Sequence, residues 1–306
     1  MNFTEDKEKT AGQKQDYIDS LRRLIEKRQS DAENVRNEYL DGIFENPGKY
    51  REDLKKMLGW PLVGHETKGL PEVTYEKIHD DEEGFSVYRM SFEILEGVKL
   101  YGLLFKAGEE KKPLVLVQHG GGGSPEFIAA AYRDNGHTND QKYPCTGNYN
   151  DMLQRVLKHG VHAFAPQLLL WNQEDYNIDY NRQEVDARLK RVGSSITAVE
   201  IYGLSRILDY FETKDYVSEF GMVGLSYGGF YTLFTTALDT RIKSAVSCAF
   251  FNSRDYVGWP DWVWQNSSEK FDDADVACLV YPRRICLEVA DNDHLFNYKH
   301  GEESFE

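Results

Sequence analysis

The chain has 306 residues, and its 51 Asp and Glu against 36 Lys and Arg give a formal net charge of −15 at pH 7. This length suits one large α/β domain or two small ones and can bury a core without disulfide or metal staples. An apolar share of 41% excludes wholesale disorder. The acidity argues against nucleic acid or a membrane as a partner, because both attract a basic surface.

The cysteines and the N-terminus bear on the compartment. Cys145, Cys248, Cys278 and Cys286 are scattered and form no C-x-x-C pair, so neither a disulfide framework nor a zinc site is expected. Cys248 and Cys286 lie in apolar runs, which predicts buried thiols. The first residues lack the apolar core of a secretory signal, and no run approaches the ~18 apolar residues of a membrane helix. We therefore expect a cytoplasmic protein without a required metal or other cofactor.

Residues 1–70 predict an N-terminal helical extension. Apolar residues recur there with helical spacing, and basic residues occupy the other side. Ser30 or Asp31 is the expected cap of a second helix, and a third short helix is expected from Tyr50 to Leu58. This polar block carries no recognisable chemistry, so we expect an arm or part of a contact between copies in a homo-oligomer.

From Val73 on, the pattern changes to short extended runs. Residues 85–94 and 98–105 flank a Glu96-Gly97 turn and predict an antiparallel hairpin. Further apolar runs are typical of strands buried on both faces of a parallel sheet, at 113–117, 161–165, 220–223, 242–250 and 284–289. Helices are predicted among them, at 149–158, 194–211 and 230–238. The alternation predicts one α/β domain over residues 71–306, built on a doubly wound, mostly parallel sheet.

A G-x-S-x-G motif, Gly224-Leu-Ser226-Tyr227-Gly228, stands between a predicted strand and a predicted helix. This placement is typical of a nucleophile elbow, a sharp turn that lifts the serine hydroxyl out of the sheet while small neighbours let the backbone bend. The following helix N-terminus presents N–H groups to a developing oxyanion. The alternative is a phosphate-binding turn, but neither G-x-G-x-x-G nor a partner lysine accompanies the motif.

Four glycines, Gly120 to Gly123, follow the strand at 113–117 and come directly after His119. Consecutive glycines cost backbone entropy and are expected where the backbone approaches a ligand closely. In a hydrolase with such an elbow, an N–H of Gly121 or Gly122 joins the N–H of Tyr227 in an oxyanion hole. A merely flexible loop is the alternative, and His119 is expected to brace the loop rather than to act as a base.

Two aspartates, Asp291 and Asp293, follow the last predicted strand. An acidic residue just beyond a late strand is where a triad carboxylate is expected, because strand ends face the site. Asp291 also suits a turn-capping role. No H-x-x-x-H pattern occurs, and the remaining histidines are expected to be structural or exposed.

Three tryptophans, Trp259, Trp262 and Trp264, lie within six positions after a strand end. They predict either an aromatic wall for an acyl group or a sugar ring, or a packed cap segment or dimer contact. The sequence does not choose between the two. The stretch at 171–191 predicts a long insertion at the entrance of the site.

These motifs resemble the α/β-hydrolase superfamily and, within it, the dienelactone-hydrolase and acetyl-xylan-esterase-like branch. The resembling segments lie within residues 98–297, about two-thirds of the chain, and are residues 113–124, 221–233, 237–246 and 288–296. The resemblance implies the α/β-hydrolase fold, with Ser226 as the nucleophile and Asp293, fourth in an Ala-x-x-Asp turn, as the triad carboxylate. It implies a serine hydrolase of the esterase or deacetylase type, acting on a small-molecule carboxylic ester.

The chain departs from that branch near its C-terminal end. The branch carries its catalytic histidine after one more helix and strand, whereas only residues 294–306 follow Asp293 here. Three alternatives stay open: the given sequence stops before that histidine, His300 or His294 serves instead, or the protein is a catalytically inactive relative. The choice matters because an unassisted serine hydroxyl is a weak nucleophile at pH 7.

Two other functions compete with an esterase. An oligopeptidase-like serine peptidase shares the G-x-S-Y-G-G elbow, but residues 1–97 are too few for the large gating domain it would carry. A non-catalytic binding protein would keep the fold and lack the base.

Overall fold

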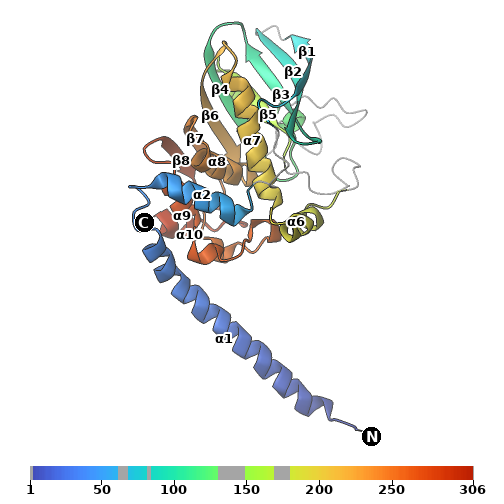
Figure 1. Ribbon diagram of the computed structural model, residues 1–306, viewed down its shortest axis with the longest axis vertical. Coiled ribbons are helices and arrows are strands. Elements are labelled where there is room, and N and C mark those ends of the chain that lie inside the picture. The colour runs from blue at the N-terminus through green and yellow to red at the C-terminus, as the bar shows by residue number, and fades with distance from the viewer. Residues whose placement is uncertain (1–2, 61–67, 81–83, 130–148, 169–179, 306) are drawn as a thin grey trace.

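The computed structural model describes residues 3–60, 68–80, 84–129, 149–168 and 180–305. Its eight strands form one sheet in the order β1-β2-β3-β5-β4-β6-β7-β8 (Figure 1). The strands are β1 Val73–Asp80, β2 Phe85–Leu95, β3 Val98–Ala107, β4 Lys112–Gln118, β5 His162–Pro166, β6 Val217–Leu225, β7 Ile242–Cys248 and β8 Arg284–Glu288. The pairs among β1, β2, β3 and β5 are antiparallel, and those among β5, β4, β6, β7 and β8 are parallel. The predicted mostly parallel sheet is therefore confirmed.

The predicted hairpin is the antiparallel pair β2–β3, which joins Phe85 to Ala107 at one end and Leu95 to Val98 at the other. The turn falls at Glu96-Gly97, where Gly97 has φ +74°. A glycine suits this position because a side chain is disfavoured at positive φ.

Helices cover both faces of the sheet and create two apolar cores. The larger core packs α2 Pro47–Leu58, α7 Ile196–Glu212, α8 Tyr227–Leu238 and α9 Asp273–Cys278 against one face. The smaller core packs α3 Pro125–Ile128 and α4 Met152–Leu157 against the other. Strand β4 shows the alternation that this requires, since Leu114 and Leu116 belong to the larger core and Val117 to the smaller.

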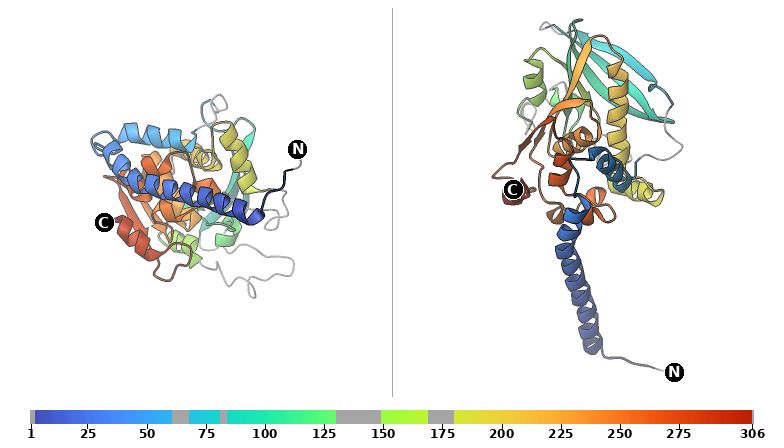
Figure 2. Two further views of the ribbon diagram at one scale, coloured as in Figure 1. Left: turned by 90° about the horizontal axis from the view of Figure 1, so that it is seen from below. Right: turned by 60° about the vertical axis from the view of Figure 1, so that its left-hand side comes forward.

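The N-terminal region differs from its prediction. It forms one continuous helix, α1 Lys7–Tyr39, so no second helix begins at Ser30 or Asp31. The reason is that no glycine or proline interrupts residues 13–41, and an internal Asp or Ser does not by itself end a helix. Figures 1 and 2 show α1 extending away from the rest of the molecule, with only its C-terminal part against it. Of the described helices, none is both long and apolar enough to cross a bilayer.

Three local expectations need correction. Helix α8 begins at Tyr227, immediately after Ser226, rather than at residue 230. Part of the expected insertion is a helix, α6 Arg182–Arg191, while residues 169–179 lie outside the described residues. Cys286 is exposed and Cys248 half-buried, because β8 is the last strand of the described sheet and its residues alternate between half-buried and exposed.

The remaining described helices are short. They are the 3-10 turns η2 Arg254–Tyr256, η3 Pro260–Trp262 and η4 Ser267–Glu269, which follow β7, and α10 Tyr298–Phe305, which follows β8.

Candidate active site

Ser226 occupies the single position between strand β6 and helix α8, with φ 57° and ψ −123°. A non-glycine residue at positive φ is strained, and such strain persists only where the surroundings enforce it. Here the Ser226 N–H donates to the carbonyl oxygen of Cys248 on β7, at 2.8 Å. Serine is a favoured helix N-cap, yet this side chain makes no capping hydrogen bond to α8. The fold therefore holds the residue in a strained turn without using its hydroxyl for the helix.

The flanking glycines are required by close backbone contacts. A Cβ on Gly224 would lie 2.2 Å from the carbonyl oxygen of Gly228, and one on Gly228 would lie 2.3 Å from that of Gln118. Both neighbours are backbone atoms and cannot rotate away. The glycines of the motif thus allow the backbones of β6, α8 and the end of β4 to pack closely together.

The glycine loop lies directly beside the elbow. Strands β4 and β6 pair in parallel as far as Gln118 and Gly224, so the loop leaves the sheet at the level of the elbow. A Cβ on Gly120 would lie 3.3 Å from the Cβ of Ser226, and one on Gly121 would lie 3.7 Å from Cδ2 of Tyr227. Three residues singled out in the sequence, Ser226, Tyr227 and Gly121, are therefore brought together.

Two N–H groups of the glycine loop donate hydrogen bonds within the described part of the chain, and two do not. The Gly120 N–H donates to the Tyr149 hydroxyl at 2.8 Å, and the Gly123 N–H donates to the Gly120 carbonyl at 3.2 Å. The N–H groups of Gly121 and Gly122 make no hydrogen bond to any described residue, and both glycines are exposed. Gly122, at φ +71°, has open space where a Cβ would stand. Tyr149 was not foreseen, because nothing in its sequence context marks a loop anchor.

His119 braces the loop, as expected. Its Nδ1 lies 2.8 Å from the Gly120 carbonyl oxygen, and its Nε2 lies 3.3 Å from the amide nitrogen of Gln167. Burial lowers the pKa of His119 to about 4, so the ring is neutral near pH 7. A neutral ring with Nδ1 donating and Nε2 accepting satisfies both contacts.

The side chain of Tyr227 is anchored by a buried ionic network. Its hydroxyl lies 3.3 Å from Oδ1 of Asp261, whose Oδ2 accepts from Nε of Arg182 at 2.8 Å. Arg182 is 1% exposed and also donates to both carboxylate oxygens of Glu200, at 2.9 Å each, and to the Tyr231 hydroxyl. Burial alone would lower the pKa of Arg182, but these neighbours raise it well above its usual value. The network ties the start of α8 to α6, α7 and η3.

Sequence analysis missed this network, although one signal was present. Glu200 stands four residues after Ile196 and four before Leu204, on the apolar face of its helix. A charged residue on such a face indicates a buried partner, because an unpaired buried charge is costly. The identity of that partner depends on tertiary contacts.

The tryptophan cluster divides between the two predicted roles. Trp262 and Trp264 are buried and stack against Phe230 of α8, with centroid separations of 4.7 and 6.3 Å. Trp259 is half-buried, and its ring stacks on Tyr227 at 4.9 Å with an interplanar angle of 3°. Two of the tryptophans are therefore packing residues, while Trp259 forms an aromatic surface beside the residue that follows Ser226.

Asp293 lies at the same carboxyl edge of the sheet, beyond β8. Leu225, Cys248 and Glu288 pair in a row across β6, β7 and β8. The end of β8 therefore lies two strand spacings, about 10 Å, from the end of β6, where the turn at Ser226 begins. Oδ1 of Asp293 accepts from the N–H groups of Leu295 at 2.8 Å and Phe296 at 3.0 Å.

The turn-capping role expected of Asp291 is taken by Asp293. The exposed Asp291 makes no side-chain hydrogen bond to a described residue, whereas Asp293 caps the turn. The reason is spacing along the chain: an aspartate side chain caps N–H groups two and three residues ahead, and the N–H groups that need an acceptor here lie two and three residues beyond Asp293.

In the described part of the chain, no histidine is hydrogen-bonded to Ser226. His300 stacks on Tyr256 with ring centroids 3.7 Å apart, and its Nδ1 lies 3.4 Å from a carboxylate oxygen of Glu303. His294 is exposed. Among the described residues, no histidine makes a hydrogen bond with Ser226 or Asp293, and His65 and His137 lie outside those residues. The three alternatives for the catalytic histidine therefore stay open.

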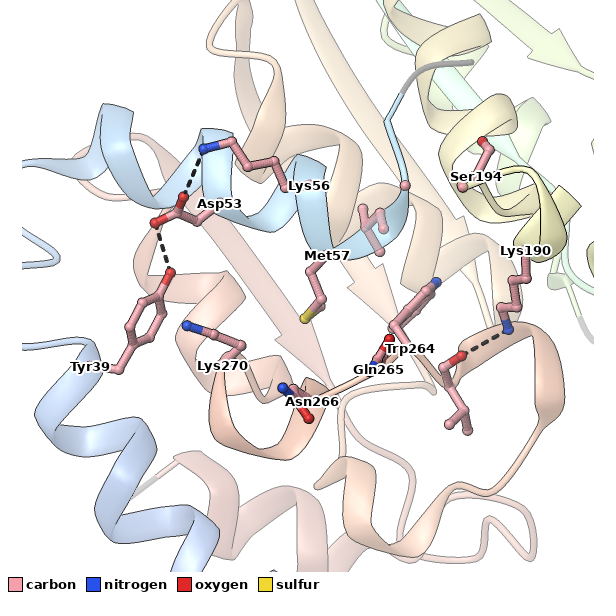
Figure 3. A pocket seen from close by; sticks show the side chains of 14 residues that line it. Tyr39, Asp53, Lys56, Met57, Lys190, Ser194, Trp264, Gln265, Asn266 and Lys270 are labelled. Carbon is pink, nitrogen blue, oxygen red and sulfur yellow. Dashed lines mark hydrogen bonds and ion pairs between the residues drawn. The ribbon is translucent and has the colours of Figure 1, made fainter. Parts of the chain in front are cut away.

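A cavity of about 630 Å³ lies elsewhere, among the C-terminal end of α1, α2, the end of α6 with the residues that follow it, and the segment after η3 (Figure 3). Tyr39, Lys56, Lys190, Trp264 and Lys270 are among its lining residues, whereas Ser226, Asp293 and the residues predicted for the oxyanion hole are not. No group of three or more His, Cys, Asp or Glu side chains in the described part of the chain is arranged to hold a metal ion.

Comparison with known proteins gives structural but not sequence relatives. No protein-family model and no curated protein matches the chain. A candidate acetyl xylan esterase from Bacteroides fragilis superposes with a TM-score of 0.65 at 17% identity, over 78% of this chain and 66% of that protein. The chain thus spans just under two thirds of that protein's length.

Two further solved structures are also similar to the chain in fold. A glucuronoyl esterase from Solibacter usitatus has a TM-score of 0.53 at 15% identity, over 83% of this chain and 77% of its own. An acetyl xylan esterase from Paenibacillus sp. R4 has a TM-score of 0.52 at 15% identity, over 82% and 90%. At this identity the likeness establishes the architecture, and the chain has the α/β-hydrolase fold.

Proposed function

We propose that the chain is a serine hydrolase that cleaves carboxylic esters, of the esterase or deacetylase type. The observation that carries this proposal is the strained Ser226 standing against the glycine loop. A strained serine between a strand and a helix, beside a loop with N–H groups that donate to no described residue, is the arrangement that acyl transfer to a serine needs.

In this mechanism Oγ of Ser226 attacks the ester carbonyl carbon, and the hydroxyl proton passes to a base. The carbonyl oxygen becomes an oxyanion that accepts hydrogen bonds from the N–H of Tyr227, at the first position of α8, and from Gly121 or Gly122. Collapse expels the alcohol, which takes the proton from the base. Water then attacks the acyl-enzyme by the same steps and releases the acid and the serine.

The base is a histidine oriented by Asp293. Backbone N–H groups occupy Oδ1 of that aspartate, which leaves Oδ2 to hold an imidazole. Asp293 follows β8, whose end lies two strand spacings from the end of β6 before Ser226, and a histidine between the two strand ends would join them. His294 and His300 follow β8, as Asp293 does, and are the candidates for this base in the described part of the chain.

The substrate in this proposal is a small ester. Support comes from the structural neighbours, which are named as acetyl xylan and glucuronoyl esterases. Trp259, stacked on Tyr227, offers a flat aromatic surface for an acyl group or a sugar ring. A reducing, cytoplasmic compartment belongs to the same proposal and agrees with the free thiols of Cys248, Cys278 and Cys286.

Active-site labelling tests the proposal. A fluorophosphonate probe should mark the parent protein and the Ser218→Ala variant, and should not mark Ser226→Ala. Ser218 is a matched control because it is exposed at the opposite end of the same strand, β6. Hydrolysis of a short-chain aryl ester should fall by at least about 10⁴-fold in Ser226→Ala.

The same assays separate the rival functions. Turnover of short peptides in preference to aryl esters would indicate a peptidase. Absence of labelling, with ester turnover no higher than in Ser226→Ala, would leave a binding protein of the same fold. Labelling of His294→Gln and His300→Gln variants identifies the base.

A further inference from the structure

Helix α1 is held at one end only. Its contacts with the body begin at Arg28, which pairs with Glu269 at 3.0 Å, and continue with Arg36, which pairs with Asp275 at 3.1 Å. The hydrogen bonds and ion pairs of residues 7–27 within the described chain all stay inside the helix. Figures 1 and 2 show this part of α1 projecting away from the other elements.

The projecting part carries an exposed apolar stripe. Its members are 39–65% exposed and share one face of the helix: Tyr17, Ile18, Leu21, Leu24 and Ile25. A helix in water draws most of its stability from packing an apolar face, and only Ala32 of α1 is buried. A stripe of this kind on a free helix indicates a surface that another molecule covers.

The stripe is symmetric about Leu21. Tyr17 and Ile25 stand four residues to either side of Leu21, and Ile18 and Leu24 stand three to either side. An antiparallel copy of the same helix, related by a twofold axis through Leu21, would therefore place apolar side chains opposite apolar side chains. Such self-complementarity is what a twofold interface requires.

The charged residues of α1 favour the same antiparallel arrangement. A twofold axis at Leu21 places residues 15–20, whose Asp16 and Asp19 give a net charge of −2, opposite residues 22–27, whose Arg22, Arg23 and Lys27 against Glu26 give +2. Antiparallel pairing therefore sets opposite charges against each other, whereas parallel pairing brings like charges together. The chain as a whole, at −15, also disfavours an anionic membrane as the cover.

The body limits how far the two helices run side by side. It occupies the same face of α1 from Arg28 on, about 10 Å beyond Leu21. The helices therefore cross at an angle, as packed helices in globular proteins commonly do at about 50°. Beyond the crossing, residues 7–14 of each helix, whose Lys7, Lys9 and Lys14 against Glu8 give a net charge of +2, extend toward the partner's body, which belongs to a chain of net charge −15.

We propose that α1 is a dimerisation arm, which crosses α1 of a second copy in antiparallel sense at Leu21. The apolar crossing fixes the position, and the contact of residues 7–14 with the partner's body enlarges the interface. A stable interface buries about 800 Å² per partner, which is more than five half-exposed side chains supply, so both contacts are needed.

Light scattering of the full chain tests the proposal. The parent protein should have twice the mass of one chain at micromolar concentration, and Leu21→Asp, which places two carboxylates on the twofold axis, should be a monomer. Ser30→Asp introduces the same charge half a turn around the helix, nine residues away, and should remain a dimer. Raising the salt concentration should weaken the parent dimer, because the ends attract by charge.

Crosslinking keeps the test independent of helix stability. On oxidation, Leu21→Cys should form a disulfide-linked dimer, whereas Ser30→Cys and the parent, which control for the exposed native Cys286, should not. A monomeric parent, a dimer that survives Leu21→Asp, or failure of Leu21→Cys to crosslink would each overturn the proposal. Sedimentation of a monomeric parent with phosphatidylserine vesicles would assign the stripe to a membrane instead.

Discussion

Two stretches of the sheet's carboxyl edge, around Ser226 and around Asp293, are held by different kinds of contact. The first is backbone against backbone, as the 2.3 Å approach that a Cβ on Gly228 would make to Gln118 shows. The second is a turn capped by one carboxylate oxygen, beyond the half-exposed strand β8. The part of the site that would stabilise an oxyanion is thus built rigidly, whereas the part that would move protons depends on side chains that the described contacts leave apart.

The largest expected effect tests the second stretch. In a chain that hydrolyses esters, Asp293→Asn should lower kcat by about 10³–10⁴-fold, because the amide no longer holds a histidine in the correct tautomer or stabilises its charge. The amide oxygen can still accept from Leu295 and Phe296, so the melting temperature should change little. Steady-state kinetics and thermal unfolding of one preparation measure both quantities.

The neighbouring aspartate supplies the control. Asp291→Asn should keep kcat within a few-fold, because Asp291 is exposed and makes no side-chain hydrogen bond to a described residue. If Asp291→Asn were instead the damaging change, the carboxylate assignment would move to that residue.

Adding a methyl group at Gly224 tests the rigidity of the backbone around Ser226. Gly224→Ala should lower the free energy of unfolding by at least about 3 kcal/mol, because its Cβ would meet the Gly228 carbonyl. Gly221→Ala, on the same strand, should change it far less, since its nearest contact is an ordinary 3.5 Å to the Ser244 carbonyl oxygen. Urea unfolding of both variants measures this difference. Equal losses of unfolding free energy would show that the backbone around Ser226 can shift to accept a methyl group.

The smallest expected effect is a pH dependence that arises from His119. The folded state keeps this ring neutral down to about pH 4, whereas the unfolded chain protonates it below about pH 6.5. The group therefore leaves stability untouched above pH 6.5 and lowers it by about 3 kcal/mol as pH falls to 4.

Replacing the histidine removes that dependence. His119→Asn should lose less stability than the parent between pH 6.5 and pH 4.5, whatever its stability at neutral pH. The exposed His159→Asn should follow the parent. Parallel slopes for His119→Asn and the parent in denaturant titrations would mean that His119 protonates freely in the folded protein.

Much of this molecule could be predicted from local patterns. Apolar runs predicted the parallel strands, and G-x-S-x-G between a strand and a helix predicted the sharp turn at Ser226, because both depend on a few consecutive residues. The glycine run after β4 predicted a loop beside that turn, since neighbouring parallel strands end at one edge. Helix α1 shows the limit of such reasoning, because its internal Ser30 and Asp31 suggested a break that the continuous helix does not have.

The sequence by itself therefore determined the parallel strands, the kind of sheet and the place of the sharp turn at Ser226, because spacing and backbone sterics act over short distances along the chain. Only the tertiary structure decided that Tyr149 anchors the glycine loop, that Arg182 joins Glu200 and Asp261 behind Tyr227, and that the apolar stripe of α1 is left uncovered. These contacts join residues far apart in sequence, and their geometry follows from how helices and strands pack rather than from any local pattern.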